Sequence, residues 1–525
     1  MNTPNKRFSE ALKVLKSIQD RSIVGIHTTD IPRAIHRQIL IKEGFIKEVT
    51  KGWYIATNPS EKDGETTSWY SSYWDFIAQY LHHKYGDNWC LSADQSLLLH
   101  AGNWSVPSQI LIRSQLGNNN PTPLPHHTSL FNLKTSVPPA QQMVTYKGIR
   151  MYSLSASLIY CTPSVFVHHS LDVRTALSLI RDASELLPTL LENGHSSIAA
   201  RLAGAFRNIQ RELIANQIKD TFKQSYYDFR EIDPFEKKLN IEFVLRERSP
   251  YSTRIRLLWM QMREVVIANF PPAPGLPPSK EAFLQSIEDI YLTDAYHSLS
   301  IERYRVTPEL IERVSSGLWN TKENEEDKKH RDAMAARGYY QAFKSVKESI
   351  GSIIDGENAG KQVAIDHGKW YRELFDPSVS SGLLKPSDLA GYRNNQVYIG
   401  GSKHVPLQVD AMRDAMPVLF ELLEQEPEAS VRAVLGHFIF VFIHPYMDGN
   451  GRIARFLMNA MLASGGYTWT VIPLESRDEY MYTLEKASVE HNILPFVKFI
   501  TYLATESLSG NIVAELPFYH KSYRI

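Results

Sequence analysis

The sequence has little cysteine, no net charge and no long apolar run, and each absence excludes a class of protein. Cys90 and Cys161 are the only cysteines in 525 residues. Two are too few for a disulfide framework or a cysteine metal cluster, which fits a reducing compartment. Lys plus Arg and Asp plus Glu both number 57, so whole-chain charge indicates no nucleic-acid partner.

The longest apolar run, residues 438–443, is far shorter than the about 20 residues that a membrane helix needs. The polar stretch 1–20 lacks the apolar segment of a signal peptide. We therefore expect a cytoplasmic protein with no membrane partner.

Length and composition indicate a soluble protein of several domains. A chain of 525 residues exceeds what one hydrophobic core usually organises, so we expect two to four domains. The proline-rich segment 270–278 predicts a stiff connector, although a loop packed within one domain would have the same composition. Residues 321–337 are highly charged and predict a solvated stretch.

The first 56 residues have the pattern of a winged helix-turn-helix. Apolar residues at helical spacing over 8–20 precede Asp30, which can cap a second helix, and two strands about a Lys51-Gly52 turn would form the wing. Residues 1–55 hold ten Lys or Arg against five Asp or Glu, a local excess that suits DNA phosphates. Winged helices also bind proteins, so both partners stay open. The second helix would present four basic residues: Arg33, His36, Arg37 and Lys42.

Residues 444–455 concentrate side chains that suit nucleotide chemistry. Gly449 and Gly451 flank Asn450 and let backbone N–H groups approach an anion. A helix that starts near Asn450 would direct its free N–H groups and its dipole at a pyrophosphate. Four side chains complete the pattern: His444 as general base, Asp448 as Mg²⁺ ligand, and Arg452 and Arg455 as phosphate ligands.

The run His-Pro-Tyr-Met-Asp-Gly-Asn-Gly-Arg-Ile-Ala-Arg at 444–455 resembles the signature of the Fic family. Tyr446 stands where the family usually has phenylalanine, and it keeps the aromatic side chain. The resemblance implies a protein adenylyltransferase that uses ATP and Mg²⁺ and transfers AMP to a Ser, Thr or Tyr hydroxyl of a target protein. It also implies an all-α core with a β-hairpin flap.

Two features around this loop extend the resemblance. Residues 391–406 resemble the Fic flap, which would hold the target peptide, although a plain structural hairpin is the alternative. The flap residues would be Val397, Tyr398, Ile399 and Gly400. Tyr480 and Leu484 share one helical face and resemble side chains that line the adenine pocket; ordinary core packing is the alternative.

A third feature resembles the inhibitory helix that many Fic proteins carry ahead of the core. Ser298 and Glu302 lie four residues apart, on one face of a predicted helix. In the family the glutamate pairs with the second signature arginine, here Arg455, and blocks placement of the γ-phosphate. Arg303 stands where the family has Gly or Asn. A glutamate that simply faces solvent is the alternative.

Residues 57–240 carry a weaker resemblance. The stretch 89–104, which follows the winged helix, resembles the AbiEi-type antitoxin and regulator family and implies an α+β middle domain. Histidine pairs occur at 82–83, 126–127 and 168–169, but adjacent side chains point apart and no second pair lies at ligand spacing. We expect neither catalysis nor metal binding in this region.

The sequence thus predicts a mainly α protein in five parts. These are a winged helix-turn-helix over 1–56, an AbiEi-like α+β domain over 57–240, a connector over 241–280, a Fic domain over 281–510 and a tail over 511–525. The expected function is AMP transfer inhibited by Glu302, with DNA bound through residues 1–56. Whether two copies form a homodimer stays open.

Three other functions compete with this prediction. Residues 449–454 fit the G-x-G-x-x-A pattern of a Rossmann dinucleotide site after the strand-forming run 438–443, but five residues intervene and the run also fits a buried helix over 427–442. A DNA-binding regulator could use a Fic-like domain only to sense nucleotide. A deAMPylase could use Glu302 to activate water beside Mg²⁺.

Overall fold

The computed structural model describes residues 4–61, 66–192, 194–225, 228–236, 249–316, 331–389, 391–511 and 513–517. These residues are mainly α-helical, with three small sheets, so the predicted fold class is confirmed. The chain divides into two compact units. Unit 1 is Met1–Arg254 with Tyr398–Val405, and unit 2 is Ile255–Val397 with Pro406–Ile525. Within the described ranges, no helix has the length and hydropathy needed to cross a membrane.

The beginning of unit 1 contains two helices and an antiparallel sheet in the order β1-β3-β2. Buried Leu15, Ile18, Leu40 and Tyr54 join the helices to the sheet in one core. Gly52, with φ of 79°, makes the β2–β3 turn, so the predicted helices and the Lys51-Gly52 turn are confirmed. The predicted cap is wrong: the second helix begins at Ala34 after Arg33, and Asp30 instead accepts from the His27 N–H at 2.8 Å in the short turn before it. The elements are α1 (Pro4–Asp20), β1 (Ile26–His27), α2 (Ala34–Lys42), β2 (Ile46–Thr50) and β3 (Trp53–Ala56).

The predicted basic face of α2 is wrong for one residue. His36 is 5% exposed, and its Nε2 lies 3.7 Å from Oε2 of Glu10 in α1, because it falls on the face of α2 that packs inward. The side chain of Arg33 is 71% exposed and is also 3.7 Å from Glu10. Lys42 is exposed and Arg37 is half-buried. DNA contact by these three residues stays a prediction.

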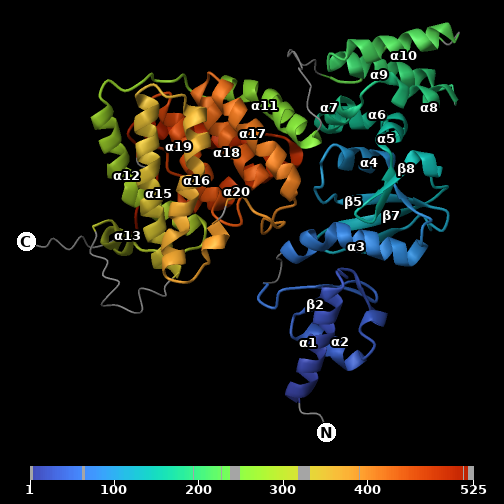
Figure 1. Ribbon diagram of the computed structural model, residues 1–525, viewed down its shortest axis with the longest axis horizontal. Helices are drawn as coiled ribbons and strands as arrows, with labels where there is room; N and C mark the ends of the chain where they lie inside the picture. Colours follow the sequence, from blue (N-terminus) through green and yellow to red (C-terminus); the bar gives the residue numbers. More distant parts are fainter. Residues whose placement is uncertain are drawn as a thin grey trace, which may run out of the picture. The chain divides into compact units, whose positions relative to one another are not determined.

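The middle of unit 1 is built on a four-stranded mixed sheet in the order β4-β5-β7-β6, in which β5 and β7 are parallel. Figure 1 shows these two strands between α3 and α4. The aromatic residues of α3, among them Trp69, Tyr73 and Phe76, pack with Ile110 and Leu130 of the sheet. The elements are α3 (Thr67–Tyr85), β4 (Cys90–Leu91), α4 (Ala93–His100), β5 (Gln109–Ser114), β6 (Pro121–Leu124), β7 (Thr128–Lys134), β8 (Met143–Tyr146) and β9 (Ile149–Tyr152).

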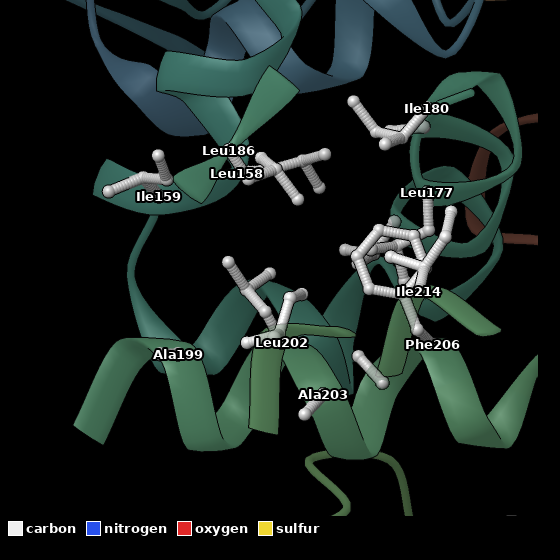
Figure 2. Packing of buried hydrophobic residues seen from close by; sticks show 14 of the residues in the cluster. Leu158, Ile159, Leu177, Ile180, Leu186, Ala199, Leu202, Ala203, Phe206 and Ile214 are labelled. Atoms are coloured by element: carbon white, nitrogen blue, oxygen red, sulfur yellow. The ribbon is translucent and has the colours of Figure 1, made fainter. Parts of the chain in front are cut away.

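Short helices complete unit 1. Their apolar faces share one core, in which Leu177, Leu202, Phe206 and Ile214 are fully or almost fully buried (Figure 2). The helices are α5 (Leu154–Tyr160), α6 (Pro163–His168), α7 (Ser170–Leu179), α8 (Leu187–Glu192), α9 (Ser196–Asn208) and α10 (Glu212–Gln224).

Unit 2 is helical, and α15 and α16 run side by side in it (Figure 1). The run 438–443 lies in helix α18, which excludes the Rossmann alternative because that site needs a strand there. The helices are α11 (Pro250–Asn269, in unit 2 from Ile255 onward), α12 (Lys280–Ile301), α13 (Pro308–Ser315), α15 (Arg331–Ile354), α16 (Ala359–Ser380), α17 (Val409–Gln425), α18 (Ala429–Ile443), α19 (Asn450–Ala463), α20 (Arg477–Glu490) and α21 (Leu494–Leu508).

The predicted connector over 241–280 is wrong where the structure describes it. Residues 255–269 are helical, and Trp259 Nε1 donates to Glu426 within unit 2. The proline-rich segment is held there too, because Tyr467 Oη donates to the Pro271 carbonyl at 2.6 Å. The packed-loop alternative therefore applies. Residues 241–248, the part of the charged stretch before Arg331 and tail residues 518–525 lie outside the described residues.

The predicted β-hairpin over 391–406 is also wrong, because the described chain has no strand in this range. Side chains in this range donate to backbone carbonyl groups that would otherwise accept hydrogen bonds between the two strands of a hairpin. Arg393 donates to the carbonyls of Asn395 and Leu407, and Gln396 donates to that of Pro406 at 2.7 Å. Residues 391–408 therefore form an irregular loop.

Candidate functional site

The residues of the 444–455 pattern lie in the tight loop between α18 and α19. His444 ends α18 with left-handed φ and ψ of 57° and 62°, and Gly449, with φ of 81°, caps the start of α19. Left-handed residues other than glycine are uncommon, and they occur more often at functional positions. The helix start expected near Asn450 is confirmed.

Two buried residues fix the shape of this loop. Tyr446 stacks on Tyr371, with ring centroids 3.8 Å apart and an interplanar angle of 8°. Asn450 accepts from the Tyr446 N–H and donates to the Tyr446 carbonyl, each at 2.9 Å. Because the Asn450 side chain is used in this way, it leaves only its backbone N–H for the predicted phosphate contact.

The His444 imidazole is held in one tautomer. Its Nδ1–H donates to the Val441 carbonyl at 3.2 Å, since a carbonyl can only accept, and Nε2 therefore carries the lone pair. Burial lowers the pKa of His444 to about 4, and the positive charge of Arg393 acts in the same direction. A neutral imidazole at pH 7 with an unprotonated Nε2 can accept a proton.

Arg452 is a buried cation with unused donors. Its guanidinium carbon lies 5.1 Å from the ring centroid of Tyr304 and 4.9 Å from that of Phe375, and the residue is 1% exposed. Its Nε and Nη1 have no hydrogen-bond partner among the described residues. Buried donors are normally paired, so this arrangement at a helix start suits an anion.

Arg455 is bound by the end of α12. Its Nε donates to Ser298 Oγ at 2.8 Å, and its Nη2 donates to the Ser298 carbonyl at 3.0 Å and to Glu302 Oε1 at 2.8 Å. A Cβ on Gly451 would lie 2.3 Å from the same Glu302 oxygen. The Glu302 carboxylate therefore lies against the first turn of α19, beside the expected phosphate position.

The end of α12 explains why Gly or Asn would suit position 303. Arg303 has φ of 65°, and its N–H donates to the Ser300 carbonyl, while the Tyr304 N–H donates to the Leu299 carbonyl. This is a Schellman motif, whose left-handed residue is usually glycine or asparagine. Arg303 occupies that position with an exposed side chain, so the residue that follows Glu302 is conformationally strained.

Asp448 is the carboxylate available to a metal ion at this loop. It is 60% exposed; its Oδ1 accepts from the Gly449 N–H at 2.6 Å, and its Oδ2 lies 3.7 Å from Arg452. Among the described residues, no three His, Cys, Asp or Glu side chains form a metal cluster. A single exposed carboxylate fits Mg²⁺, which usually keeps waters and takes other ligands from phosphates.

The remaining predicted residues are the adenine-side pair and the flap. Tyr480 is 1% exposed and Leu484 7% exposed, and Tyr480 Oη bonds to His437 Nε2 at 2.8 Å. These positions favour the core-packing alternative, and adenine contact stays a prediction. Of the flap residues, Val397 belongs to unit 2 and Tyr398–Gly400 to unit 1, so their contact with a target also stays a prediction.

Sequence reasoning missed Arg393, which connects the 391–408 loop to the His444 loop. The residue is 2% exposed; its Nε donates to the His444 carbonyl at 2.8 Å and its backbone N–H to the Pro445 carbonyl at 2.9 Å. The same guanidinium also binds the Leu407 carbonyl at the far end of the loop. A lone arginine in a loop gives no sequence signal for such a contact.

Part of the chain is similar to known proteins. Residues 367–462 match the Fic/DOC family. Protein adenylyltransferase Fic from Drosophila willistoni and from Drosophila virilis are each 37% identical over 131 residues, which is 24% of this chain and 26% of theirs. The chain thus spans about a quarter of the length of these relatives. A solved structure of Fic-1 from C. elegans has a TM-score of 0.36 and 16% identity, covering 65% of this chain and 86% of that one.

Proposed function

Because the chain carries a Fic/DOC-family domain at residues 367–462, we propose that it transfers AMP from ATP to a Ser, Thr or Tyr hydroxyl of a target protein. The observation that carries this proposal is the position of His444, whose Nδ1 bonds to the Val441 carbonyl, in the loop that leads into the glycine-lined start of α19. The Drosophila relatives are named protein adenylyltransferases, which supports the same reaction.

In this reaction His444 acts as general base. Nε2 accepts the proton of the target hydroxyl, the hydroxyl oxygen attacks the α-phosphorus of ATP, and pyrophosphate leaves with the electron pair of the broken P–O bond. The Nδ1–H bond to Val441 keeps the imidazole oriented during this transfer. General-base catalysis typically contributes roughly 10²–10⁴-fold, and positioning of the reactants contributes the rest.

The start of α19 binds the phosphates in this proposal. Its free N–H groups at Gly451 and Arg452 and the unpartnered donors of the Arg452 guanidinium would face phosphate oxygens. Asp448 would hold Mg²⁺, which neutralises phosphate charge when bound.

Glu302 is the inhibitory residue in this proposal. Its carboxylate lies against Gly451 and uses Nη2 of Arg455, so a γ-phosphate at the same place would meet a like charge and an occupied donor. Removal of AMP from a target, with Glu302 activating water, is the alternative use of the same carboxylate.

Labelled ATP tests the reaction. Incubation of the Glu302→Gly protein with ATP labelled at the α-phosphate should label protein, and ATP labelled at the γ-phosphate should not. His444→Asn should lose the label, because asparagine tolerates the left-handed backbone but provides no base. Met447→Ala, at an exposed position of the same loop, is the matched control. Tight ATP binding with no transfer of either label would instead support the nucleotide-sensing regulator.

DNA binding is a separate proposal for the N-terminal part. The exposed side chains of Arg33 and Lys42 support it. Charge reversal of both residues should weaken binding to mixed-sequence duplex DNA and reduce its salt dependence. Equal binding by the parent and the reversed variant would leave the protein-binding alternative.

A further inference from the structure

Asp294 is a buried carboxylate that the proposed reaction does not use. It lies on α12 four residues before Ser298 and eight before Glu302, so the three residues follow one stripe of the helix. Asp294 is 3% exposed, whereas the Glu302 side chain is 28% exposed. The stripe thus has an inner and an outer carboxylate, with Ser298 between them.

Arg455 and the inner carboxylate are each hydrogen-bonded to a neighbouring side chain. Arg455 Nε donates to Ser298 Oγ at 2.8 Å, one helical turn after Asp294. Tyr339 Oη, which is fully buried on α15, donates to Asp294 Oδ2 at 2.6 Å. The positive charge of Arg455 also lowers the pKa of Asp294, so the two charged groups act on each other.

Arg455 needs a counter-charge whether or not Glu302 is in place. The guanidinium is 3% exposed, and a buried cation that loses its partner is strongly destabilising. In the proposed function Glu302 leaves Arg455 when ATP binds productively. Between the departure of Glu302 and the arrival of a phosphate, Asp294 is the buried carboxylate whose pKa the charge of Arg455 lowers.

We propose that Asp294 is the permanent counter-charge and positioning residue of Arg455, and that it holds the guanidinium toward the start of α19 when Glu302 is displaced. This proposal rests on the proposed function, because it assigns Asp294 a role in the nucleotide-accepting state. Tyr339 holds Asp294 in place, and Ser298 holds Arg455. The half-buried Glu302 is then free to move without leaving a buried cation unpaired.

The electrostatics around Asp294 agree with this role. Burial raises the pKa of Asp294 to about 6, while the Tyr339 hydrogen bond and the Arg455 charge oppose that rise. The groups that face it are Tyr339 on α15, Arg455 on α19 and Trp469. Asp294 is therefore mainly ionised at pH 7.5 and mainly protonated at pH 5.

A double-mutant cycle without nucleotide tests the proposal. The Tm of the full-length parent, Asp294→Asn, Glu302→Gln and the double variant is measured at pH 7.5. Asp294→Asn should leave Tm unchanged or raise it while Glu302 pairs with Arg455. In the Glu302→Gln background the same substitution should lower Tm, because no carboxylate then balances the cation. The difference between the Tm changes in the two backgrounds should shrink at pH 5, because Asp294 is then mainly protonated. An equal effect of Asp294→Asn on Tm in both backgrounds would overturn the proposal.

Tyr339→Phe keeps the test decisive if Asp294→Asn fails to fold. It removes the hydrogen bond to Asp294 without altering charge, and it should lower Tm more in the Glu302→Gln background than in the parent. Tyr340→Phe is the matched control, because Tyr340 is the next residue of α15 and contacts Lys344 and Tyr291 instead. An equal decrease in Tm from Tyr339→Phe in both backgrounds would contradict a link between Asp294 and Arg455.

An ATP arm separates this proposal from the reaction itself. ATP should raise the Tm of the double variant more than that of Glu302→Gln alone, because a bound phosphate supplies the missing negative charge. If ATP changes the Tm of no variant while Asp294→Asn and Glu302→Gln still have non-additive effects on Tm, the nucleotide assignment fails and the role of Asp294 stands. If the coupling is absent while ATP stabilises every variant, the role of Asp294 fails and the reaction stands.

Discussion

Glu302 Oε1 lies 2.8 Å from Arg455 Nη2 and 2.3 Å from the position that a Cβ on Gly451 would take. One carboxylate oxygen thus contacts both the buried cation and the glycine turn that the proposed reaction needs for phosphate. This shared position, together with the residues that hold the His444 loop, determines how substitutions should change AMP transfer.

Replacement of Glu302 should raise AMP transfer. Glu302→Gly removes the carboxylate from the first turn of α19 and frees Nη2 of Arg455 for a phosphate oxygen. The initial rate of label incorporation from α-labelled ATP measures the change. Glu281→Gln, an exposed site in the first turn of the same helix, should leave the rate unchanged. No rise in the Glu302→Gly rate would remove the inhibitory role.

Replacement of Arg303 should tighten the end of α12. A left-handed residue other than glycine costs roughly 1–2 kcal/mol, so Arg303→Gly should raise the free energy of unfolding by about 1 kcal/mol. Because the same turn holds Glu302, transfer by this variant should be slower than by the parent. Chemical denaturation and label incorporation measure the two effects, and Arg303→Asn should act in the same direction. A destabilised Arg303→Gly protein would contradict this explanation.

The pH dependence of transfer should lack the usual histidine inflection near pH 6.5. Since the folded-state pKa of His444 is lowered to about 4, the base stays neutral as pH falls from 8 to about 5 and becomes protonated only below that. In Glu302→Gly the loss of a nearby negative charge should lower the pKa of His444 further. Rate profiles of this variant, with folding monitored by circular dichroism, test the prediction. A rate that halves near pH 6.5 would contradict it.

Replacement of Arg393 should slow transfer more than it weakens nucleotide binding. Arg393→Gln removes the guanidinium bond to the His444 carbonyl and the bond to the Leu407 carbonyl, so both loops lose their shared anchor. Misplacement of a catalytic group by about 1 Å can cost roughly 10²-fold, whereas the phosphate contacts on α19 stay in place. Single-turnover rates and ATP Kd values separate the two effects. A larger Kd with an unchanged rate would assign Arg393 to nucleotide binding.

The fold was predictable where local pattern determines it. The helix start at Asn450, the buried helix before His444 and the β2–β3 turn at Gly52 each depend on residues close in sequence. The 391–406 hairpin was wrong because Arg393 and Gln396 bind carbonyl groups across the loop, a contact that strand propensity does not encode. His36 was wrong because α2 turns that residue toward Glu10 of α1.

The site was predictable to the extent that the 444–455 pattern contains it. Ser298 and Glu302 were identified, and their contacts with Arg455 are present, although their inhibitory role stays a prediction. Asp294 shares their four-residue spacing and could have been noticed. Its hydrogen bond from Tyr339 could not have been noticed, because the two residues lie on different helices and are 45 positions apart in sequence.

The most direct test of the account is intact-protein mass spectrometry after incubation with ATP and Mg²⁺. The Glu302→Gly protein should gain the mass of one or more AMP groups on itself or on an added target, and Glu302→Gly with His444→Asn should gain none. Equal AMP addition by both variants would contradict the role of His444 as the base beside the start of α19.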